Sequence, residues 1–450
     1  MTPGAQSLDQ RFAGAMGDLL GPDFPSDIAL AVSGGGDSMA MLTLAHNWAH
    51  VWGTRLWVVT IDHGLRPEAA QEAALVRETC AELGHPHATL RWHRDGTGNV
   101  MAEARAARLA LIDRWRGGLR HVLMAHTRDD VAETFLMRLR RGSGVDGLAA
   151  MAPRRVVAQQ VDVPGEITGD APPTAPRDGG YEVLRPCLSM RRAELRHYLS
   201  VLKGRWVDDP SNDDDRFERV RMRRLLADLD AQGLGADCLA DTAQRMARSR
   251  EALARRAADI RERIGVEPQV NGVPTGEIVI DRDGLAPVER ETQLRLLAAA
   301  LQYVASADYR PRADALEAAL DRLLSGGSTT LHGCELRCER ARIRVFREYS
   351  AVAGHLVQMG PRAVWDGRWR LENAALEGLC IRALGEDGWR QVAVKPDVAP
   401  PFVSARSLPS VWDGEELIAC PAMGVGPACF VALRPANGAA PDFRNFLLSH

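Results

Sequence analysis

Between Asp27 and His126 the sequence alternates short β-rich runs with amphipathic stretches, and this alternation limits the possible folds more than any other feature. Residues 28–32 form an apolar run with the length of a buried strand, and residues 38–51 follow with a helical pattern. Three more strand-like runs and two helical stretches continue the alternation, at residues 55–61, 68–83, 87–92, 99–115 and 121–125. Such alternation favours a mostly parallel sheet with helices on both faces. We therefore predict an α/β fold built on a doubly wound, Rossmann-like sheet.

Ligands of such a sheet bind at the carboxyl ends of its strands. The chemistry is therefore expected directly after Val32, Ile61 and Ala125. Polar residues follow each of these positions. We expect the three polar groups to lie at one edge of the sheet.

The loop after the first strand is rich in glycine and hydroxyl groups. It reads Ser33, Gly34, Gly35, Gly36, Asp37 and Ser38, and a helix is predicted to follow. Glycines allow positive φ and a close approach of the backbone, and the amides at a helix N-terminus bind phosphate oxygens. Asp37 is a candidate Mg²⁺ ligand. The alternative is a tight turn in which Asp37 or Ser38 caps the helix, but a cap does not require three glycines.

Two more groups are candidates for the walls of a nucleotide pocket. Asp62 and His63 end the second strand-like run, and Gly64 fits a sharp exit from that strand. Arg105 and Arg108 lie three residues apart on one face of a predicted helix, where they can contact phosphates together. Alternatively, Asp62 and His63 are only polar residues at the end of a strand, and Arg105 and Arg108 are only solvent-exposed arginines on a helix.

Acidic residues surround the end of the last strand-like run. His126 precedes Asp129, Asp130 and Glu133, and the last two share a face of the predicted helix. The helix dipole explains one or two acids at a helix start, but not three acids beside a histidine at a ligand edge. This acidic face is a candidate site for a cationic substrate, such as the ammonium groups of an amino acid, or for a second metal ion.

Two arginine-rich segments are candidates for contacts with RNA. One reads Arg-Leu-Arg-Arg-Gly-Ser-Gly from residue 138, and the other follows an Asp-Asp-Pro-Ser-Asn turn at residues 208–212. The candidate arginines are Arg138, Arg140, Arg141, Arg219, Arg221 and Arg223. The last three occupy every second position of a predicted helix, so they do not share one face. Solvated surface charge is the alternative for both segments.

These motifs together resemble a known family. The glycine loop resembles the SGGxDS signature of the adenylating pyrophosphate-loop (PP-loop) ATP pyrophosphatases, and the sequence has no GxxxxGK[ST] loop. The motifs that follow are DHGLR at 62–66, DDxxET at 129–134 after His126, RGxG at 141–144, RPxL at 185–188 and DDPSN at 208–212. Their order resembles that of the tRNA(Ile)-lysidine synthase family. The likeness covers residues 33–223, about half of the chain, and Val131 and Val220 stand where the family often has Gln and Asn.

The resemblance implies an adenine nucleotide α-hydrolase-like fold and a ligase that uses ATP and Mg²⁺. Such an enzyme adenylates the oxygen on carbon 2 of the wobble cytidine in a tRNA(Ile) with a CAU anticodon. Free lysine then attacks carbon 2 through its ε-amine and expels AMP, which forms lysidine.

The same resemblance implies roles for the selected residues. Residues 33–38 bind ATP together with Asp62 and His63, and Asp37 holds Mg²⁺. Arg105 and His126 lie near the phosphates. Asp130 and Glu133 receive lysine, and Arg221 with its neighbours serves the reaction centre or the RNA backbone.

Two other functions remain open from the sequence. The first is another adenylating PP-loop enzyme, such as one that thiolates tRNA or amidates small acids. Thiolation relatives usually carry paired CxxC motifs, whereas the closest cysteines here are Cys334 and Cys338, and no glutaminase domain for amidation is visible. The second is a non-catalytic protein that binds RNA and nucleotide.

The length of 450 residues predicts several domains. We expect a catalytic domain at residues 1–215, a helical linker at 216–265, an accessory α+β domain for tRNA recognition at 266–350 and a β-rich domain at 351–450. Within them, residues 217–263 are predicted to form one long charged helix. Residues 152–180, which are rich in proline and glycine, are predicted to form a mobile excursion.

The composition is that of a soluble globular protein, with 46% hydrophobic and 26% charged residues. The apolar runs are shorter than the roughly 20 residues that cross a bilayer. The first ten residues do not have the pattern of a secretory signal. These features predict a cytoplasmic protein without a membrane partner. They leave the oligomeric state open, with a homodimer as one alternative.

Overall fold

The computed structural model describes residues 6–64, 68–94, 98, 100–158, 163–172, 179–208, 218–307, 309–360, 363–433 and 442–449. The chain forms two compact units, Met1–Arg250 and Glu251–His450. Within the described residues, no helix combines the length and the apolar character needed to cross a membrane.

The first unit contains the α/β alternation that the sequence predicts. Its helices are α1 (Leu8–Leu20), α2 (Gly36–Trp52), α3 (Ala69–Leu83), α4 (Val100–Trp115), α5 (Arg128–Leu139), α6 (Val145–Leu148), α7 (Arg192–Val201), α8 (Glu218–Asp230) and the first part of α9 (Ala236–Ile264). Its strands are β1 (Asp27–Ala31), β2 (Arg55–Asp62), β3 (His87–Trp92), β4 (His121–Met124), β5 (Arg154–Val157), β6 (Gly165–Gly169) and β7 (Tyr181–Leu184).

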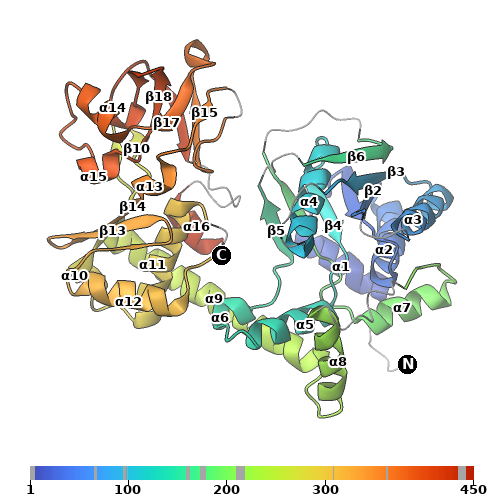
Figure 1. Cartoon of the computed structure of the whole chain (residues 1–450). Helices are drawn as coiled ribbons and strands as arrows, with labels where there is room; N and C mark the ends of the chain where they lie inside the picture. Colours follow the sequence, from blue (N-terminus) through green and yellow to red (C-terminus); the bar gives the residue numbers. More distant parts are fainter. Residues whose placement is uncertain are drawn as a thin grey trace. The chain divides into compact units, whose positions relative to one another are not determined.

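In the described part of this unit, the strands form one seven-stranded sheet in the order β5-β7-β4-β1-β2-β3-β6. Figure 1 labels β2, β3 and β4 of this sheet together with its edge strands β5 and β6. The five central strands are parallel, and β5 and β6 pair antiparallel at the two edges. The chain runs from β1 outward to β2 and β3, and then returns to the other side of β1 with β4. Ligands bind where the strand order reverses in this way. The site is therefore expected between the ends of β1 and β4.

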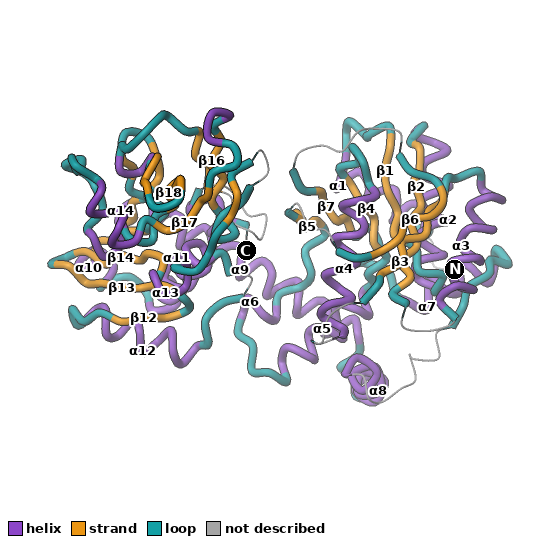
Figure 2. Tube along the Cα trace, turned by 45° about the horizontal axis from the view of Figure 1, so that its top comes forward, coloured by secondary structure: helices purple, strands orange, loops and turns teal. Residues whose placement is uncertain are grey.

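The apolar run of β1 is buried on both of its faces because helices cover both sides of the sheet, as the colours of Figure 2 show. Ile28 and Leu30 pack in a cluster that includes residues of α1, α2 and α7. Ala29, which points the other way, packs in the cluster that contains the apolar residues of α4. The predicted α/β fold with a mostly parallel sheet is confirmed.

The segment at residues 152–180 corrects one prediction, because its described parts are ordered strands rather than a mobile excursion. β5 pairs with β7, and β6 pairs with β3, so this segment supplies both edges of the sheet. Edge strands expose much of their surface, and β5 and β6 therefore lack the apolar alternation that identifies a strand in a sequence.

The predicted long helix at residues 217–263 is also wrong, because it is two helices. α8 ends at Asp230 and α9 begins at Ala236. Gly233 lies between them with a φ of +77°, a backbone conformation that glycine adopts without strain. Residues 231–235 read Ala-Gln-Gly-Leu-Gly, so an uncharged stretch with two glycines marks the break in the sequence.

The second unit combines helices with several small sheets. Its helices are the rest of α9, α10 (Arg282–Leu285), α11 (Arg290–Ala305), α12 (Ala313–Leu324), α13 (Tyr349–Val352), α14 (Gly385–Gln391), α15 (Phe402–Ala405) and α16 (Phe443–Leu448). Its strands are β8 (Gly265–Val266), β9 (Gln269–Val270), β10 (Val273–Pro274), β11 (Ile278–Asp281), β12 (Thr329–Leu331), β13 (Cys334–Glu339), β14 (Arg342–Arg347), β15 (Val357–Gln358), β16 (Trp369–Glu372), β17 (Cys380–Ala383), β18 (Pro409–Asp413), β19 (Glu416–Ala419) and β20 (Phe430–Leu433).

The last helix of the chain belongs to the core around α11. The ring of Tyr303 lies 5.5 Å from that of Phe443 and 5.4 Å from that of Phe446. Both phenylalanines are buried in the cluster that contains α11, β11, β13 and β14. The chain therefore returns to this core after the strands of residues 357–433. The predicted domain boundaries at residues 265 and 350 stay predictions.

His87 makes the stability of the first unit depend on pH. It is buried at the start of β3, with Nε2 2.9 Å from Thr60 Oγ1. Burial lowers the pKa of His87 to about 4, from an ordinary value of 6.5, and Arg77 adds to this shift. Between these two values the unfolded chain binds a proton that the folded chain does not, so stability falls as the pH falls through this window.

At pH 5 the expected loss from this one group is about 2 kcal/mol. We therefore expect the melting temperature of a His87→Gln variant to drop less between pH 7 and pH 5 than that of the wild-type protein. Calorimetry at both pH values measures the two drops, and equal drops would contradict the assignment to His87.

Candidate active site

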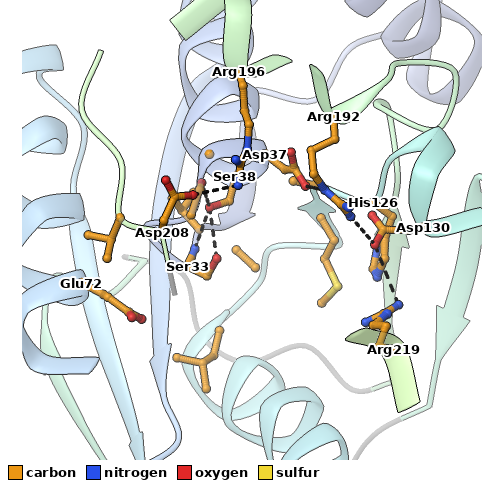
Figure 3. A pocket seen from close by; sticks show the side chains of 18 of the residues that line it. Ser33, Asp37, Ser38, Glu72, His126, Asp130, Arg192, Arg196, Asp208 and Arg219 are labelled. Carbon is orange, nitrogen blue, oxygen red and sulfur yellow. Dashed lines mark hydrogen bonds and ion pairs between the residues drawn. The ribbon is translucent and has the colours of Figure 1, made fainter. Parts of the chain in front are cut away.

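A cavity of about 940 Å³ opens in the first unit beside the ends of β1 and β4, at the predicted edge of the sheet. Its wall comes from the glycine loop, the ends of β2 and β4, and helices α3, α4, α5, α7 and α8 (Figure 3). The lining residues that the sequence predicts are Ser33, Gly35, Gly36, Asp37, Ser38, His63, Arg108, His126, Asp130, Arg219 and Arg223. A volume of several hundred Å³ is typical of small-molecule sites.

The glycine loop folds around the hydroxyl of Ser38. Ser38 Oγ accepts a hydrogen bond from Ser33 N at 3.1 Å, lies 3.2 Å from Ser33 Oγ and donates to the carbonyl of Gly35 at 2.9 Å. Gly34 has a φ of +84°, and its carbonyl accepts a hydrogen bond from Val207 N at 3.0 Å. These hydrogen bonds fix the conformation of the loop.

The start of α2 is suited to an anion. Gly35 occupies the N-cap position and makes no side-chain cap, so the first amides of the helix are left for other acceptors. These amides and the helix dipole attract phosphate oxygens. A Cβ atom at Gly36 would lie 3.3 Å from Arg196 Cγ, so the side chain of Arg196 passes close to the loop. The glycines thus leave space for both this arginine and a phosphate chain.

Asp37 carries a carboxylate oxygen that has no partner. Its Oδ2 accepts a hydrogen bond from Arg192 Nε at 3.0 Å, whereas its Oδ1 is buried without a hydrogen-bond partner. Burial raises the pKa of Asp37, and Arg192 offsets part of this effect. Burial of an unpartnered carboxylate oxygen is unfavourable. A hard cation such as Mg²⁺, which prefers oxygen ligands, fits this oxygen.

One guanidinium joins Asp37 to the acidic residues of α5, and Figure 3 shows it between Asp37 and Asp130. Arg192, the first residue of α7, donates from Nη1 to Glu133 Oε1 at 3.0 Å and from Nη2 to Asp130 Oδ1 at 3.2 Å. Its backbone is fixed to the same helix because Arg192 N donates to Asp129 Oδ2 at 2.8 Å. Burial disfavours the charge on Arg192, but Glu133, Asp130 and Asp37 together raise its pKa. The residue is therefore charged.

Glu133 is fully buried, with 0% of its side chain exposed, and it contacts three arginines. Oε1 accepts hydrogen bonds from Arg192 Nη1 and from Arg223 Nε, the latter at 2.8 Å, and Oε2 lies 3.3 Å from Arg219 Nε. Arg219 and Arg223 are one turn apart on α8, which packs against α5. A buried carboxylate requires such neutralisation.

Asp130 is both a helix-capping residue and a site residue. Its Oδ2 accepts hydrogen bonds from Thr127 N at 2.8 Å and from Thr127 Oγ1 at 2.9 Å, which completes a capping box. Its Oδ1 faces Arg192. Burial opposes the ionisation of Asp130, but Arg192 and Arg219 outweigh burial and lower its pKa. Asp130 therefore caps the helix through Oδ2, and its Oδ1 is the oxygen that can contact a ligand.

The side of the cavity near His126 is positive. Burial lowers the pKa of His126 to about 4, with help from Arg185 and Arg108, so its imidazole is neutral at pH 7. Burial also lowers the pKa of Arg185 to about 10 and that of Arg108. His126 Nδ1 and Arg108 Nε are buried without hydrogen-bond partners. This wall is suited to an anion.

Five residues that the sequence predicts for ATP, lysine or the reaction centre do not line the cavity: Gly34, Asp62, Arg105, Glu133 and Arg221. Arg105 does not line it, whereas Arg108, three residues later on α4, does. Asp62 Oδ1 accepts a hydrogen bond from Gly64 N at 2.8 Å and so forms the strand-exit turn. Arg221 is exposed and does not line the cavity, because its neighbours two positions before and after it occupy the face that does.

The basic segment after α5 makes internal contacts. Arg138 Nη1 donates to the carbonyl of Gly147 at 2.8 Å. Arg140 and Arg141 each donate to one oxygen of Glu218 at 2.6 Å. The contact of these three arginines with RNA stays a prediction.

Arg192 and Arg196 line the cavity but belong to none of the motifs that the sequence predicts. One signal was available. Arg191 and Arg192 begin a helix, where the dipole disfavours positive charge. Arginines at such a position require nearby carboxylates, and these come from other segments of the chain.

Val131 and Val220, which differ from the residues that the family often has, are both buried apolar residues. Val131 is buried in a cluster with Phe135, and Val220 is buried and lines the cavity. Leu65 and Arg66 of the second motif, and residues 209–212 of the last motif, lie outside the described residues.

Comparisons with known proteins agree with these motifs. The model of the PP-loop domain family matches residues 8–229. The tRNA(Ile)-lysidine synthase of Ruegeria pomeroyi is 37% identical over 429 residues, which cover 95% of each chain. That of Wolbachia pipientis wMel is 33% identical over 356 residues, or 77% of each chain. Among solved structures, the U34-tRNA thiolase NcsA of Methanococcus maripaludis aligns with a TM-score of 0.40 and 15% identity, covering 53% of this chain and 78% of that one.

Proposed function

The chain belongs to the tRNA(Ile)-lysidine synthase family, and we propose that it joins free lysine to the wobble cytidine of a tRNA(Ile) with a CAU anticodon. The PP-loop domain makes it an ATP-using ligase of tRNA. One observation supports the residue roles. The glycine loop and three acids, Asp37, Asp130 and Glu133, meet around a single guanidinium beside the cavity.

The first half-reaction is the adenylation of cytidine. ATP binds with its terminal phosphates at the amides that begin α2 and against the positive wall near His126 and Arg108. The oxygen on carbon 2 of the cytidine attacks the α phosphate, and pyrophosphate leaves. The chain contributes position and charge stabilisation rather than a covalent nucleophile. The ordered hydroxyl network of Ser33 and Ser38 supports this role, because it holds the loop amides in place before ATP arrives.

Mg²⁺ would be held by Asp37 through its unpartnered Oδ1. In the described part of the chain, no three His, Cys, Asp or Glu side chains are grouped to hold a metal, so its other ligands would come from ATP and water. The ion would supply charge stabilisation at the phosphates.

The second half-reaction is the attack of lysine. The ε-ammonium of lysine loses a proton to solvent, the neutral ε-amine adds to carbon 2 of the adenylated cytidine, and the bond between carbon 2 and the oxygen of AMP breaks. Asp130 and Glu133 provide negative charge for the ammonium groups of lysine. Both acids already contact arginines, so lysine binds there by exchange with a guanidinium.

The domain boundaries and the location of the protein in the cell are also proposals. We place the catalytic domain at residues 1–215, the linker at 216–265, and the tRNA-recognition and β-rich domains at 266–350 and 351–450. We place the reaction in the cytoplasm.

The function is tested with purified protein, ATP, radiolabelled lysine and tRNA transcripts. We expect label to enter a transcript with a CAU anticodon together with the release of AMP and pyrophosphate. A transcript with cytidine 34 replaced by uridine is the matched control and should take up no label. Pyrophosphate release without label in any transcript would mean that the chain adenylates a different acceptor or uses a different nucleophile.

A further inference from the structure

Arg192 is shared between two groups that serve different substrates. Its Nε contacts Asp37 in the glycine loop, and its two Nη atoms contact Glu133 and Asp130 on α5. Asp37 is 155 residues away from Arg192 in the sequence. A single side chain thus connects the phosphate end of the cavity with its acidic wall.

The acids on α5 have little room for a second cation while Arg192 is in place. Glu133 contacts Arg219 and Arg223 in addition to Arg192, and the second oxygen of Asp130 is used by the helix cap. A substrate ammonium that binds Asp130 therefore has to take the place of Arg192 Nη2. Glu133 remains neutralised after this exchange because Arg219 and Arg223 come from a different helix.

The displaced guanidinium has a destination at the other end of the cavity. Arg192 lines the cavity and remains tied to Asp37 through Nε. Phosphate is a preferred partner of a guanidinium, and a phosphate chain at the start of α2 lies beside Asp37. A nucleotide therefore stabilises the conformation in which Arg192 has left the acids.

We propose that Arg192 is a positioning residue that couples the nucleotide site to the lysine site by exchanging between the α5 acids and the nucleotide phosphates. This inference rests on the proposed function, because it takes ATP and lysine as the two ligands. Coupling of this kind is reciprocal: if ATP raises the affinity for lysine, lysine raises the affinity for ATP by the same factor.

The test measures the dissociation constant of labelled lysine by equilibrium dialysis, with and without α,β-methylene ATP and Mg²⁺. All samples contain the CAU transcript, and the analogue prevents adenylation. In the wild-type protein we expect the analogue to tighten lysine binding by about tenfold. Arg192→Gln, which removes the exchanging cation, should reduce this factor to near one.

Two further variants separate coupling from a general structural effect. Arg192→Lys keeps a positive charge but cannot contact three carboxylates at once, so its factor should also fall. Arg191→Gln is the matched control, because Arg191 precedes Arg192 directly and does not line the cavity. Arg191 pairs with Asp237 at 2.9 Å and more weakly with Asp129 at 3.5 Å, and it has no ion pair with Asp37, Asp130 or Glu133 among the described residues. The ATP analogue should tighten lysine binding in this variant by the same factor as in the wild-type protein.

Three results would overturn the proposal. They are a wild-type factor of one, an unchanged factor in folded Arg192→Lys or Arg192→Gln, and an equal loss of coupling in Arg191→Gln. The proposed function is judged separately by the entry of lysine into tRNA. If lysine enters the transcript but the ATP analogue does not change the dissociation constant of lysine in the wild-type protein, the proposed function is supported and the proposed role of Arg192 is wrong.

Discussion

Replacement of Asp37 by alanine is expected to lower the rate of tRNA adenylation by roughly 10³-fold or more, which corresponds to about 4 kcal/mol. The variant loses the one buried carboxylate oxygen of the glycine loop that is available for Mg²⁺. It also frees Arg192 from the loop. Single-turnover formation of adenylated tRNA in the absence of lysine measures this step directly.

The same variant is expected to remain folded. Asp37 Oδ1 is buried without a partner, and removal of such an atom relieves an unfavourable burial. Arg192 keeps its contacts with Glu133 and Asp130. We therefore expect the unfolding free energy to change by no more than about 1 kcal/mol. The variant should lose adenylation activity without losing stability.

Two other substitutions serve as controls for Asp37→Ala. Asp37→Asn keeps the volume but removes the charge, and it should lose nearly as much activity. Asp18→Asn changes an exposed acid on α1 and should leave adenylation unchanged. If Asp37→Ala kept more than a tenth of the wild-type rate, Asp37 could not be the metal ligand of this site.

The sequence predicts much of the central sheet because β1, β2 and β4 each contain a short apolar run bounded by turn residues. β3 has the same bounds in the structure, residues 87–92, as in the prediction. The glycine loop was also predictable, because a run of three glycines between a strand and a helix has few other uses. In both cases the relevant information lies within a few neighbouring residues.

The features that the sequence did not predict depend on contacts between distant segments. Arg192 meets Asp37, Asp130 and Glu133 only because α7 packs against α2 and is pinned to the start of α5. β5 and β6 are strands because they pair with β7 and β3, not because of their own pattern. Arg105 and Arg108 were equivalent in the sequence, and the packing of α4 alone decides that Arg108 faces the cavity.

Glu133→Gln is expected to destabilise the first unit and to weaken lysine binding. The glutamine keeps the shape of the side chain but leaves Arg192, Arg219 and Arg223 around a neutral group. Loss of one partner from a buried ion pair costs about 3–5 kcal/mol. For a unit of this size, at about 2–4 °C for each kcal/mol, the melting temperature should fall by roughly 6–20 °C. The KM for lysine should rise at least about tenfold, since about 1.4 kcal/mol of lost attraction gives that factor.

Glu218→Gln is a matched control because Glu218 also accepts hydrogen bonds from two arginines, but at a more exposed position. Exposed pairs contribute at most about 1 kcal/mol, so this variant should melt within a few degrees of the wild-type protein and keep its KM for lysine. The comparison isolates the effect of burial, because both variants remove one negative charge between arginines. Equal losses of stability in the two variants would show that the burial of Glu133 does not matter. An increase in the KM for ATP as large as that for lysine would instead assign Glu133 to the whole cavity rather than to its acidic wall.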